Sequence, residues 1–189
     1  MDAELGDNPG VKELESFSLP TRMGRVYVAV GPGGVVGVGL PPEGEQRLTE
    51  VLAKRVGPGA KLREVPAQEL EAGRWLMSYL SGGRPGFGVD VDLSGLREFT
   101  VQVLMATRTI PYGATVTYAT LAAMVGRPAA ARAVGRALGA NPVPVFVPCH
   151  RVVAAHGLGG FTSGVEMKRA LLAMENHTGP VLGSKGEED

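Results

Sequence analysis

The chain has 189 residues, of which 44% are hydrophobic and 20% are charged, and its formal net charge is zero. This composition is ordinary for a soluble globular protein with one large domain or two small ones. The single cysteine excludes an internal disulfide and a multi-cysteine zinc site, and it fits a reducing, cytoplasmic compartment. We expect no membrane span, because no apolar run reaches about 18 residues. Residues 1–11 are acidic and polar, unlike a signal peptide.

Charge is distributed unevenly along the chain. Residues 1–94 carry 10 Lys or Arg against 13 Asp or Glu, whereas residues 95–175 carry 8 against 3, a net charge of +5. The zero total by itself argues against a polyanion partner. The basic C-terminal half gives modest support to a nucleic-acid face, although such an imbalance also arises by chance.

The first half of the chain has the pattern of an α/β domain, for which we take the bounds 1–93. Residues 1–19 lack periodicity and are expected to form a loose arm. Apolar alternation then predicts a hairpin of two strands, 24–30 and 35–40, around a Gly-Pro-Gly-Gly turn. The remaining patterns predict a helix at 48–55, a strand at 61–65, a helix at 66–80 and a last strand at 89–93.

The second half is predicted to be a mainly α domain over residues 94–178, beginning at the Ser94-Gly95 boundary. Leu96, Phe99 and Val103 share one helical face. Thr117 is a suitable N-cap for a short helix over 118–125. Another helix is predicted over 129–138, so the pair is typical of a helix-turn-helix. A final helix is predicted from about 165 to 175, and residues 179–189 are expected to be a disordered tail.

The second helix of that pair consists largely of alanine and glycine. Arg132 and Arg136 are four residues apart and therefore lie on the same face. One interpretation is a packed alanine-rich helix with two solvated arginines. The other is a helix slim enough to press into a DNA groove. The helix alone favours neither.

The only cysteine, Cys149, follows a stiff apolar segment. Prolines at 142, 144 and 148 restrict the backbone there, and His150 comes directly after the thiol. A lone cysteine is most often a small buried hydrophobe. A rigid, dry approach with an adjacent imidazole instead favours a reactive thiol.

Several motifs of the second half resemble the O6-alkylguanine-DNA alkyltransferase family, also called methylated-DNA–protein-cysteine methyltransferases. They occur in the family's order and are Phe99-Thr-Val-Gln-Val-Leu104, Ile110-Pro-Tyr-Gly113, Thr117-Tyr-Ala-Thr-Leu-Ala122, Ala131-Arg-Ala-Val-Gly-Arg-Ala137, Asn141-Pro142, Pro148-Cys-His-Arg-Val-Val153 and Gly159-Gly-Phe161. The N-terminal half is similar to the family only in outline, through a Gly-Arg-Val-Tyr-Val strand start like that of its ribonuclease-H-like domain.

The resemblance implies a role for each matching residue. Cys149 would accept the alkyl group, His150 would take the thiol proton through a water molecule, and Glu175 would orient His150. Asn141 would brace the turn before the thiol. The resemblance further implies DNA contacts for Arg132, which would fill the gap left by the flipped base, and for Tyr118, which would turn the target phosphate. We also assign DNA contacts to Arg127, Arg136 and Arg151. The base pocket would comprise Val152, Val153, Phe161, Thr162 and Ser163. Arg151 has an alternative, structural role in pairing across the active-site turn.

The function implied is DNA repair by direct reversal. The alkyl group of O6-alkylguanine, and less efficiently that of O4-alkylthymine, would pass to Cys149 in one irreversible turnover. The partner would be double-stranded DNA carrying alkylated guanine, bound by a monomer without cofactor or metal. Free thiols are mostly protonated at neutral pH, so the His150–Glu175 pair would have to remove the proton.

Three alternatives remain open on the sequence. A helix-turn-helix regulator would use Arg127, Arg132 and Arg136 to bind DNA sequence-specifically. A non-catalytic lesion-binding relative would bind the same DNA, although such a protein lacks the cysteine. A cysteine hydrolase would use a Cys-His-Glu site to turn over an ester or a peptide.

Overall fold

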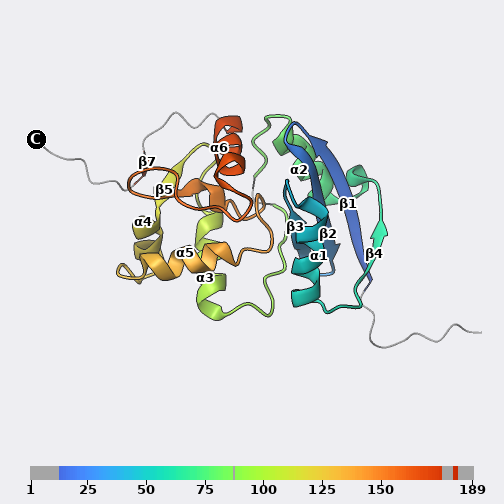
Figure 1. Cartoon of the computed structure of the whole chain (residues 1–189), viewed down its shortest axis with the longest axis horizontal. Helices are drawn as coiled ribbons and strands as arrows, with labels where there is room; N and C mark the ends of the chain where they lie inside the picture. Colours follow the sequence, from blue (N-terminus) through green and yellow to red (C-terminus); the bar gives the residue numbers. More distant parts are fainter. Residues whose placement is uncertain (1–12, 87, 176–180, 183–189) are drawn as a thin grey trace, which may run out of the picture.

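The computed structural model describes residues 13–86, 88–175 and 181–182. Two halves of the chain lie side by side, a sheet with its helices and a mainly helical half (Figure 1). Within the described residues, no helix combines the length and the hydropathy needed to cross a bilayer.

The N-terminal half contains a four-stranded sheet in the order β3-β2-β1-β4. β1 is antiparallel to β2, β2 is antiparallel to β3, and β1 is parallel to β4. The strands are β1 (Glu13–Thr21), β2 (Gly24–Gly31), β3 (Gly34–Gly39) and β4 (Lys61–Glu64). The helices are α1 (Gly44–Arg55), the 3-10 helix η1 (Ala67–Glu69) and α2 (Glu71–Leu80).

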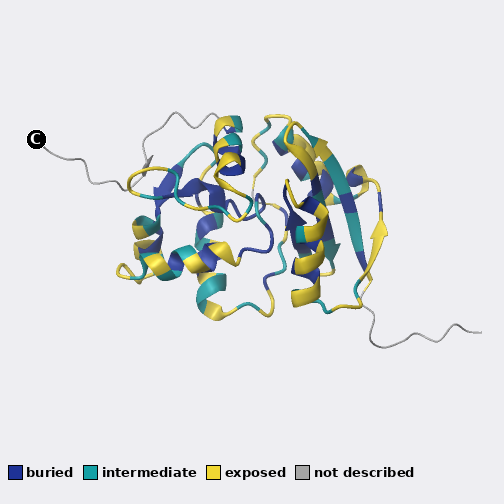
Figure 2. Cartoon of the chain, viewed as in Figure 1, coloured by how far each residue is buried: buried dark blue, intermediate teal, exposed yellow. Residues whose placement is uncertain are grey.

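Both faces of this sheet are covered. Successive strand residues point to opposite sides, and neighbouring residues of β2 belong to two different buried clusters. Val28 belongs to the large core that includes Leu76 of α2. Its neighbour Ala29 belongs to a smaller cluster with Leu48 and Leu52 of α1. Helix α1 therefore closes one face, and α2 together with the C-terminal half closes the other. Figure 2 shows the buried residues along the sheet and where the halves meet.

The predicted loose arm was wrong for residues 13–19, which form most of β1. Leu14 and Phe17 are both buried but lie three residues apart. The strand therefore lacks the simple two-residue alternation by which a strand is recognised in a sequence. Residues 1–12 lie outside the described residues.

Two other predicted elements of this half are also corrected. The strand expected at 89–93 amounts to one isolated bridge, Val91 with Val35, because this segment makes only two backbone hydrogen bonds with Val35 before it leaves the sheet. The helix expected at 66–80 is interrupted at Leu70, whose backbone is extended, so it divides into η1 and α2.

The C-terminal half surrounds a small parallel sheet in the order β6-β5-β7. Its helices α3, α4 and α5 contact one another. The elements are α3 (Glu98–Arg108), β5 (Thr115–Thr117), α4 (Tyr118–Met124), α5 (Ala131–Gly139), the 3-10 helix η2 (Cys149–Arg151), β6 (Val152–Val153), α6 (Val165–Met174) and β7 (Val181–Leu182).

Local signals located most of these helices. Thr117 caps α4 as predicted, since its Oγ1 accepts a hydrogen bond of 3.0 Å from the Thr120 N–H. Helix α5 begins at Ala131 rather than at 129, because a turn in which the Ala130 N–H donates to Arg127 O precedes it. In the expected disordered tail, Val181 and Leu182 form β7 and pair with β5. The rest of that tail lies outside the described residues.

The two halves share one core. The Trp75 ring of α2 lies 4.9 Å from the Phe146 ring, between centroids. The backbone N–H of Val38 in β3 donates to Pro142 O at 2.9 Å. Phe146 and Pro142 both belong to the stiff segment before Cys149. The N-terminal sheet and its helix α2 therefore support that segment directly.

The close packing of α2 against η1 can be tested by substituting Gly73. A Cβ at this position would lie 1.9 Å from the Ala67 carbonyl oxygen. Alanine is favoured over glycine in a helix by about 1 kcal/mol, but backbone must move to admit the methyl group. Overpacking of this kind costs about 1–3 kcal/mol, so Gly73→Ala should destabilise the protein in chemical denaturation. Gly59→Ala is the control, because its Cβ would meet nothing within 4 Å. Equal stability of the two variants would contradict this account.

Candidate active site

The thiol of Cys149 is delivered at the end of a buried segment. Val143, Val145, Phe146 and Val147 are all at most 3% exposed. Val145 has φ +78°, a left-handed conformation that costs a β-branched residue about 1–3 kcal/mol. The surrounding packing holds this strain. A stiff approach leaves the thiol little freedom of position.

Cys149 is 8% exposed, but it is not sealed in the core. It borders a cavity of about 190 Å³. Pockets for drug-sized ligands are larger, ~300–1,000 Å³, so this cavity suits a smaller ligand. The other lining residues come from α4, from α5 and from the loop after β6, and they are Tyr118, Gly135, Leu138, Gly139, Gly160, Phe161 and Thr162.

Asn141 braces the thiol directly. Its Nδ2 donates to Val147 O at 3.0 Å and to the Cys149 sulfur at 3.1 Å. Its Oδ1 accepts from the Val143 N–H at 3.1 Å. One buried amide therefore ties both ends of the approach segment and touches the sulfur itself.

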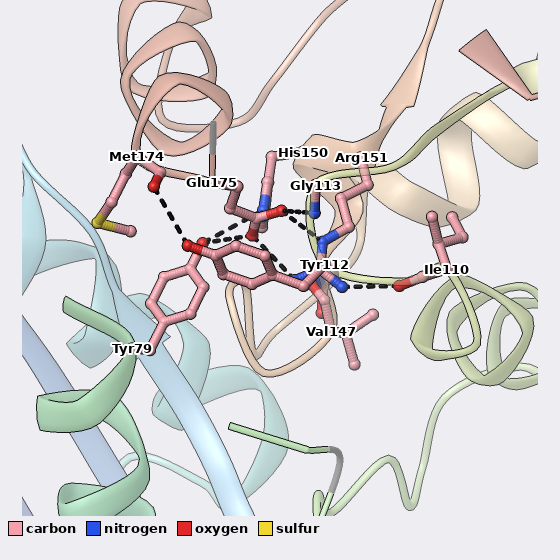
Figure 3. A network of polar contacts seen from close by, with 10 residues as sticks. Tyr79, Ile110, Tyr112, Gly113, Val147, His150, Arg151, Met174 and Glu175 are labelled. Carbon is pink, nitrogen blue, oxygen red and sulfur yellow. Dashed lines mark hydrogen bonds and ion pairs between the residues drawn. The ribbon is translucent and has the colours of Figure 1, made fainter. Parts of the chain in front are cut away.

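The carboxylate of Glu175, which follows α6, collects donors from distant parts of the chain (Figure 3). His150 Nε2 lies 2.8 Å from Oε1, and Arg151 donates to both oxygens at 2.9 Å. The Gly113 N–H donates to Oε2 at 3.1 Å, and the Tyr79 hydroxyl donates to Oε1 at 2.7 Å. The side chains of Glu175 and His150 are both fully buried.

These contacts determine the charges of the pair. Burial alone would raise the pKa of Glu175, but the hydrogen bonds of His150 and Arg151 and the positive charge of Arg151 outweigh it and hold that pKa well below its usual range. Burial lowers the pKa of His150, against the opposing effect of Glu175. The carboxylate is therefore ionised and the imidazole neutral at pH 7. Nε2 then carries the proton, and Nδ1 keeps its lone pair.

The free lone pair makes His150 a candidate base. Among the described residues, its buried Nδ1 has no hydrogen-bond partner. Burial raises the pKa of the Cys149 thiol, although the Asn141 hydrogen bond and the charge of Lys168 oppose this. The thiol is therefore protonated at rest and needs a base at the moment of reaction.

Lys168 is a site residue that sequence reasoning missed. It is fully buried on α6, and its Nζ donates to Val152 O at 2.6 Å and to Gly160 O at 3.2 Å. Burial lowers its pKa to about 8. A signal for its burial was present in the sequence. Lys168 precedes Leu171 by three residues and Leu172 by four, so it lies on the apolar face of the helix.

The predicted pocket residues lie in three places. Phe161 and Thr162 line the cavity with Cys149, and Ser163 lines a small adjoining hollow. Val152 and Val153 are buried in β6 beside β5, and neither lines the cavity.

Tyr118 stands at one wall of the cavity. Its hydroxyl donates to Gly160 O at 3.4 Å. A Cβ at Gly159 would lie 2.9 Å from that hydroxyl, and Gly159 has φ +69°. Only glycine therefore allows the loop to approach the ring so closely.

The predicted DNA-binding arginines separate into two groups. Arg127, Arg132 and Arg136 are exposed around α5, with Arg127 over the Phe99 ring. Arg151 is 3% exposed, pairs with Glu175 and donates to Ile110 O at 2.7 Å. The expectation that Arg151 contacts DNA is wrong, because its guanidinium is committed to the interior.

No group of His, Cys, Asp and Glu side chains in the described part of the chain could hold a metal ion. A buried thiol at the edge of a cavity, with a neutral imidazole and a carboxylate behind it, defines a cysteine-nucleophile site.

Comparison with known proteins narrows this class. Residues 98–177 match the family described as 6-O-methylguanine DNA methyltransferase, DNA binding domain. The inducible methylated-DNA–protein-cysteine methyltransferase of Bacillus subtilis is 41% identical over 150 residues, 79% of this chain and 83% of that relative. The methylated-DNA–protein-cysteine methyltransferase of Mycobacterium tuberculosis H37Rv is 46% identical over 106 residues, which are 56% of this chain and 64% of the relative's length.

Solved structures agree over most of both chains. Mycobacterium tuberculosis OGT in complex with DNA aligns with a TM-score of 0.69 and 32% identity, covering 85% of this chain and 92% of that one. O6-methylguanine-DNA methyltransferase from Pyrococcus kodakaraensis KOD1 aligns with a TM-score of 0.65 and 27% identity, covering 86% and 98%. The chain has the fold of these proteins, and it belongs to the methylated-DNA–protein-cysteine methyltransferase family.

The central place of Glu175 predicts a large effect of Glu175→Gln. A neutral amide would leave Arg151 as an uncompensated buried charge, which typically costs about 3–5 kcal/mol. The ionised carboxylate of wild-type Glu175 stabilises the fold, and its folded pKa lies below the unfolded value of about 4.3. This contribution is therefore fully present above about pH 4.3 and is lost as the pH falls from there through the folded pKa. Denaturant unfolding at several pH values would measure both effects. The control is Glu166→Gln, exposed on α6, which should change little. A small effect at Glu175 would contradict the assignment.

Proposed function

We propose that this protein repairs DNA by direct reversal, as a methylated-DNA–protein-cysteine S-methyltransferase. It would move the alkyl group of O6-alkylguanine, and less efficiently that of O4-alkylthymine, to Cys149. The observation that carries the proposal is the lone thiol facing a small cavity, with the neutral His150 and ionised Glu175 behind it. Family membership supports the same reaction.

The proposed step needs only one displacement. The Cys149 sulfur forms a bond to the alkyl carbon while the bond from that carbon to guanine O6 breaks. The thiol proton passes through a water molecule to His150 Nδ1, and Glu175 stabilises the imidazolium. The leaving guanine takes up a proton, for which the Tyr118 hydroxyl and the loop near Ser163 are candidate donors. The products are a thioether on Cys149 and intact guanine, so no cofactor or metal is required.

Regenerating the Cys149 thiol would require cleavage of the carbon–sulfur bond of the thioether, and no group that the structure describes at this site could promote that cleavage. His150 can accept or return a proton, but it cannot cleave a carbon–sulfur bond. We therefore propose one turnover per molecule. The free thiol that the reaction requires persists in a reducing compartment, so we propose that the protein acts in the cytoplasm. We also propose that it acts as a monomer.

DNA binding is proposed for α4 and α5, acting as a helix-turn-helix. The target atom is stacked inside the duplex, so the base must be flipped out, at a cost of a few kcal/mol. Helix α5 presents Arg132 and Arg136 to solvent and also lines the cavity through Gly135, Leu138 and Gly139. A groove that received α5 would therefore bring a flipped base to the cavity.

Within this interface we propose separate tasks for Tyr118 and the three exposed arginines. Arg132 would occupy the vacancy in the duplex, which offsets part of the flipping cost. Tyr118 would turn the target phosphate, and Arg127 and Arg136 would contact the backbone. The net charge of +5 over residues 95–175 and the DNA complex of the Mycobacterium tuberculosis relative support a DNA partner.

We also propose that the N-terminal domain is ribonuclease-H-like. The antiparallel run β3-β2-β1, continued by the parallel strand β4, supports this proposal. Val152 and Val153 would contribute backbone carbonyls near the guanine amine. Val152 O also accepts a hydrogen bond from Lys168 Nζ at 2.6 Å.

The reaction predicts a permanent mass change on one residue. After incubation with duplex DNA containing O6-methylguanine, intact-mass and peptide analysis should find one methyl group, on Cys149. Titration should saturate at one group per protein. Cys149→Ser is the control and should gain nothing. Several groups removed per molecule, or ester turnover without a mass gain, would refute the proposal. Sequence-specific binding unaffected by Cys149→Ala would favour a regulator instead.

The wedge role predicts a substrate-dependent effect of Arg132→Ala. Duplex repair should slow on the order of 10- to 100-fold, because a few kcal/mol of flipping cost would no longer be offset. Reaction with free O6-benzylguanine needs no flipping and should change little. Arg63→Ala, an exposed arginine on β4, controls for loss of a charge. Single-turnover rates on both substrates provide the test, and equal losses would exclude the wedge.

A further inference from the structure

Tyr79 belongs to the N-terminal half, yet its hydroxyl lies inside the candidate active site. The residue is on α2 and is 1% exposed. Its hydroxyl donates to Glu175 Oε1 at 2.7 Å and lies 3.4 Å from His150 Nε2 (Figure 3). The contact therefore joins residues 96 positions apart in the sequence.

The Tyr79 ring is held firmly in this place. It stacks on Trp75 of the same helix, with centroids 5.4 Å apart and planes at 9°. Trp75 in turn contacts Phe146 in the segment before Cys149. The Tyr112 ring meets Tyr79 edge-on at 6.1 Å. With the ring fixed, the hydroxyl can reach Oε1 without further ordering of the side chain.

The oxygen that Tyr79 contacts is the one that serves His150. Oε1 accepts from Tyr79, from His150 Nε2 and from Arg151 Nη2. Each additional donor draws charge from that oxygen and weakens its hold on an imidazolium. The Tyr79 hydroxyl therefore affects the basicity of His150 as well as the orientation of the carboxylate.

We propose that Tyr79 is a positioning residue for alkyl transfer, through which the N-terminal half tunes the base that deprotonates Cys149. The proposal rests on the alkyl-transfer function above. It gives the N-terminal half a part in the chemistry beyond supporting the fold. Tyr79 would act through Glu175 and His150 and would not touch the substrate.

Other charged groups also face His150, and their contributions are distinct. Glu175 follows α6, Arg151 belongs to η2, and Lys168 lies on α6; all three affect the pKa of His150. Burial and the Glu175 carboxylate raise the pKa of Tyr79 well above its usual value, so its hydroxyl stays protonated and remains a donor. Of the three donors to Oε1 named above, Arg151 carries a charge and His150 is the base itself, so Tyr79 is the one whose hydrogen bond can be removed without losing either.

The test is Tyr79→Phe, which keeps the ring and removes the hydroxyl. Full-length wild type and variant would react with free O6-benzylguanine, with single-turnover rates followed from pH 5 to 9. Loss of the donor leaves Oε1 more negative, so His150 holds its proton to higher pH. The acid limb of the profile should move up by about 0.5–1 pH unit, and the rate on that limb should fall about three- to tenfold. Affinity for duplex DNA should be unchanged.

Tyr112→Phe is the matched control. Its hydroxyl donates to Met174 O at 3.2 Å in the same region. The substitution removes a neighbouring hydroxyl but leaves the donors on Oε1 unchanged. Its acid limb should coincide with that of wild type. A shift in Tyr112→Phe equal to that in Tyr79→Phe would overturn the proposal, as would no shift in Tyr79→Phe.

Two further measurements keep the proposal falsifiable. Site-specific 3-fluorotyrosine at position 79 is a stronger donor with almost the same shape, so it should move the acid limb to lower pH; it also serves if Tyr79→Phe fails to fold. NMR titration of the His150 ring should show the same shifts without any substrate. If wild type transfers no alkyl group, the proposed function fails. If wild type reacts but the pKa of His150 is the same in wild type and in the variants at position 79, only this inference fails.

Discussion

The buried carboxylate of Glu175 is the acceptor on which the whole site depends. It holds the imidazole of His150, the guanidinium of Arg151, the backbone at Gly113 and the hydroxyl of Tyr79 around one point. A carboxylate can be buried only where donors and a positive charge replace water, and these partners supply both. Because they come from α2, from the turn before β5 and from η2, the ion at the end of α6 also fixes how these elements meet.

The state of the thiol follows from that ion. An ionised Glu175 fixes the proton of neutral His150 on Nε2 and leaves Nδ1 as the acceptor. Cys149 is buried enough to keep its proton at rest, yet it borders a cavity where a substrate carbon can reach it. Lys168 adds a positive charge that acts on the thiol, and it joins β6 to the loop that lines the cavity. The thiol is therefore neutral at rest and His150 is available as its base, which agrees with the single turnover proposed above.

The fold was predictable where the signals were local. Hairpin alternation, the Thr117 cap and the glycines that punctuate the chain located most helices and the β2–β3 hairpin. Strand β1 was missed because Leu14 and Phe17 break the alternation. A strand between two others is specified by its neighbours, through ladders to β2 and β4, more than by its own pattern. The way the halves share one core, through α2 and the segment before Cys149, likewise depends on contacts between distant residues.

The sequence by itself determined which residues could carry the chemistry: one cysteine on a stiff apolar segment with a histidine next to it, and a basic helix of small residues before it. Those features are short-range, so residue type and spacing carry them. Only the tertiary structure decided that Arg151 points inward, that Lys168 is buried against the carbonyls of Val152 and Gly160, and that Tyr79 reaches Glu175 from the other half. The direction of a side chain and the identity of its partner depend on packing between segments far apart in the chain, and no local pattern encodes that packing.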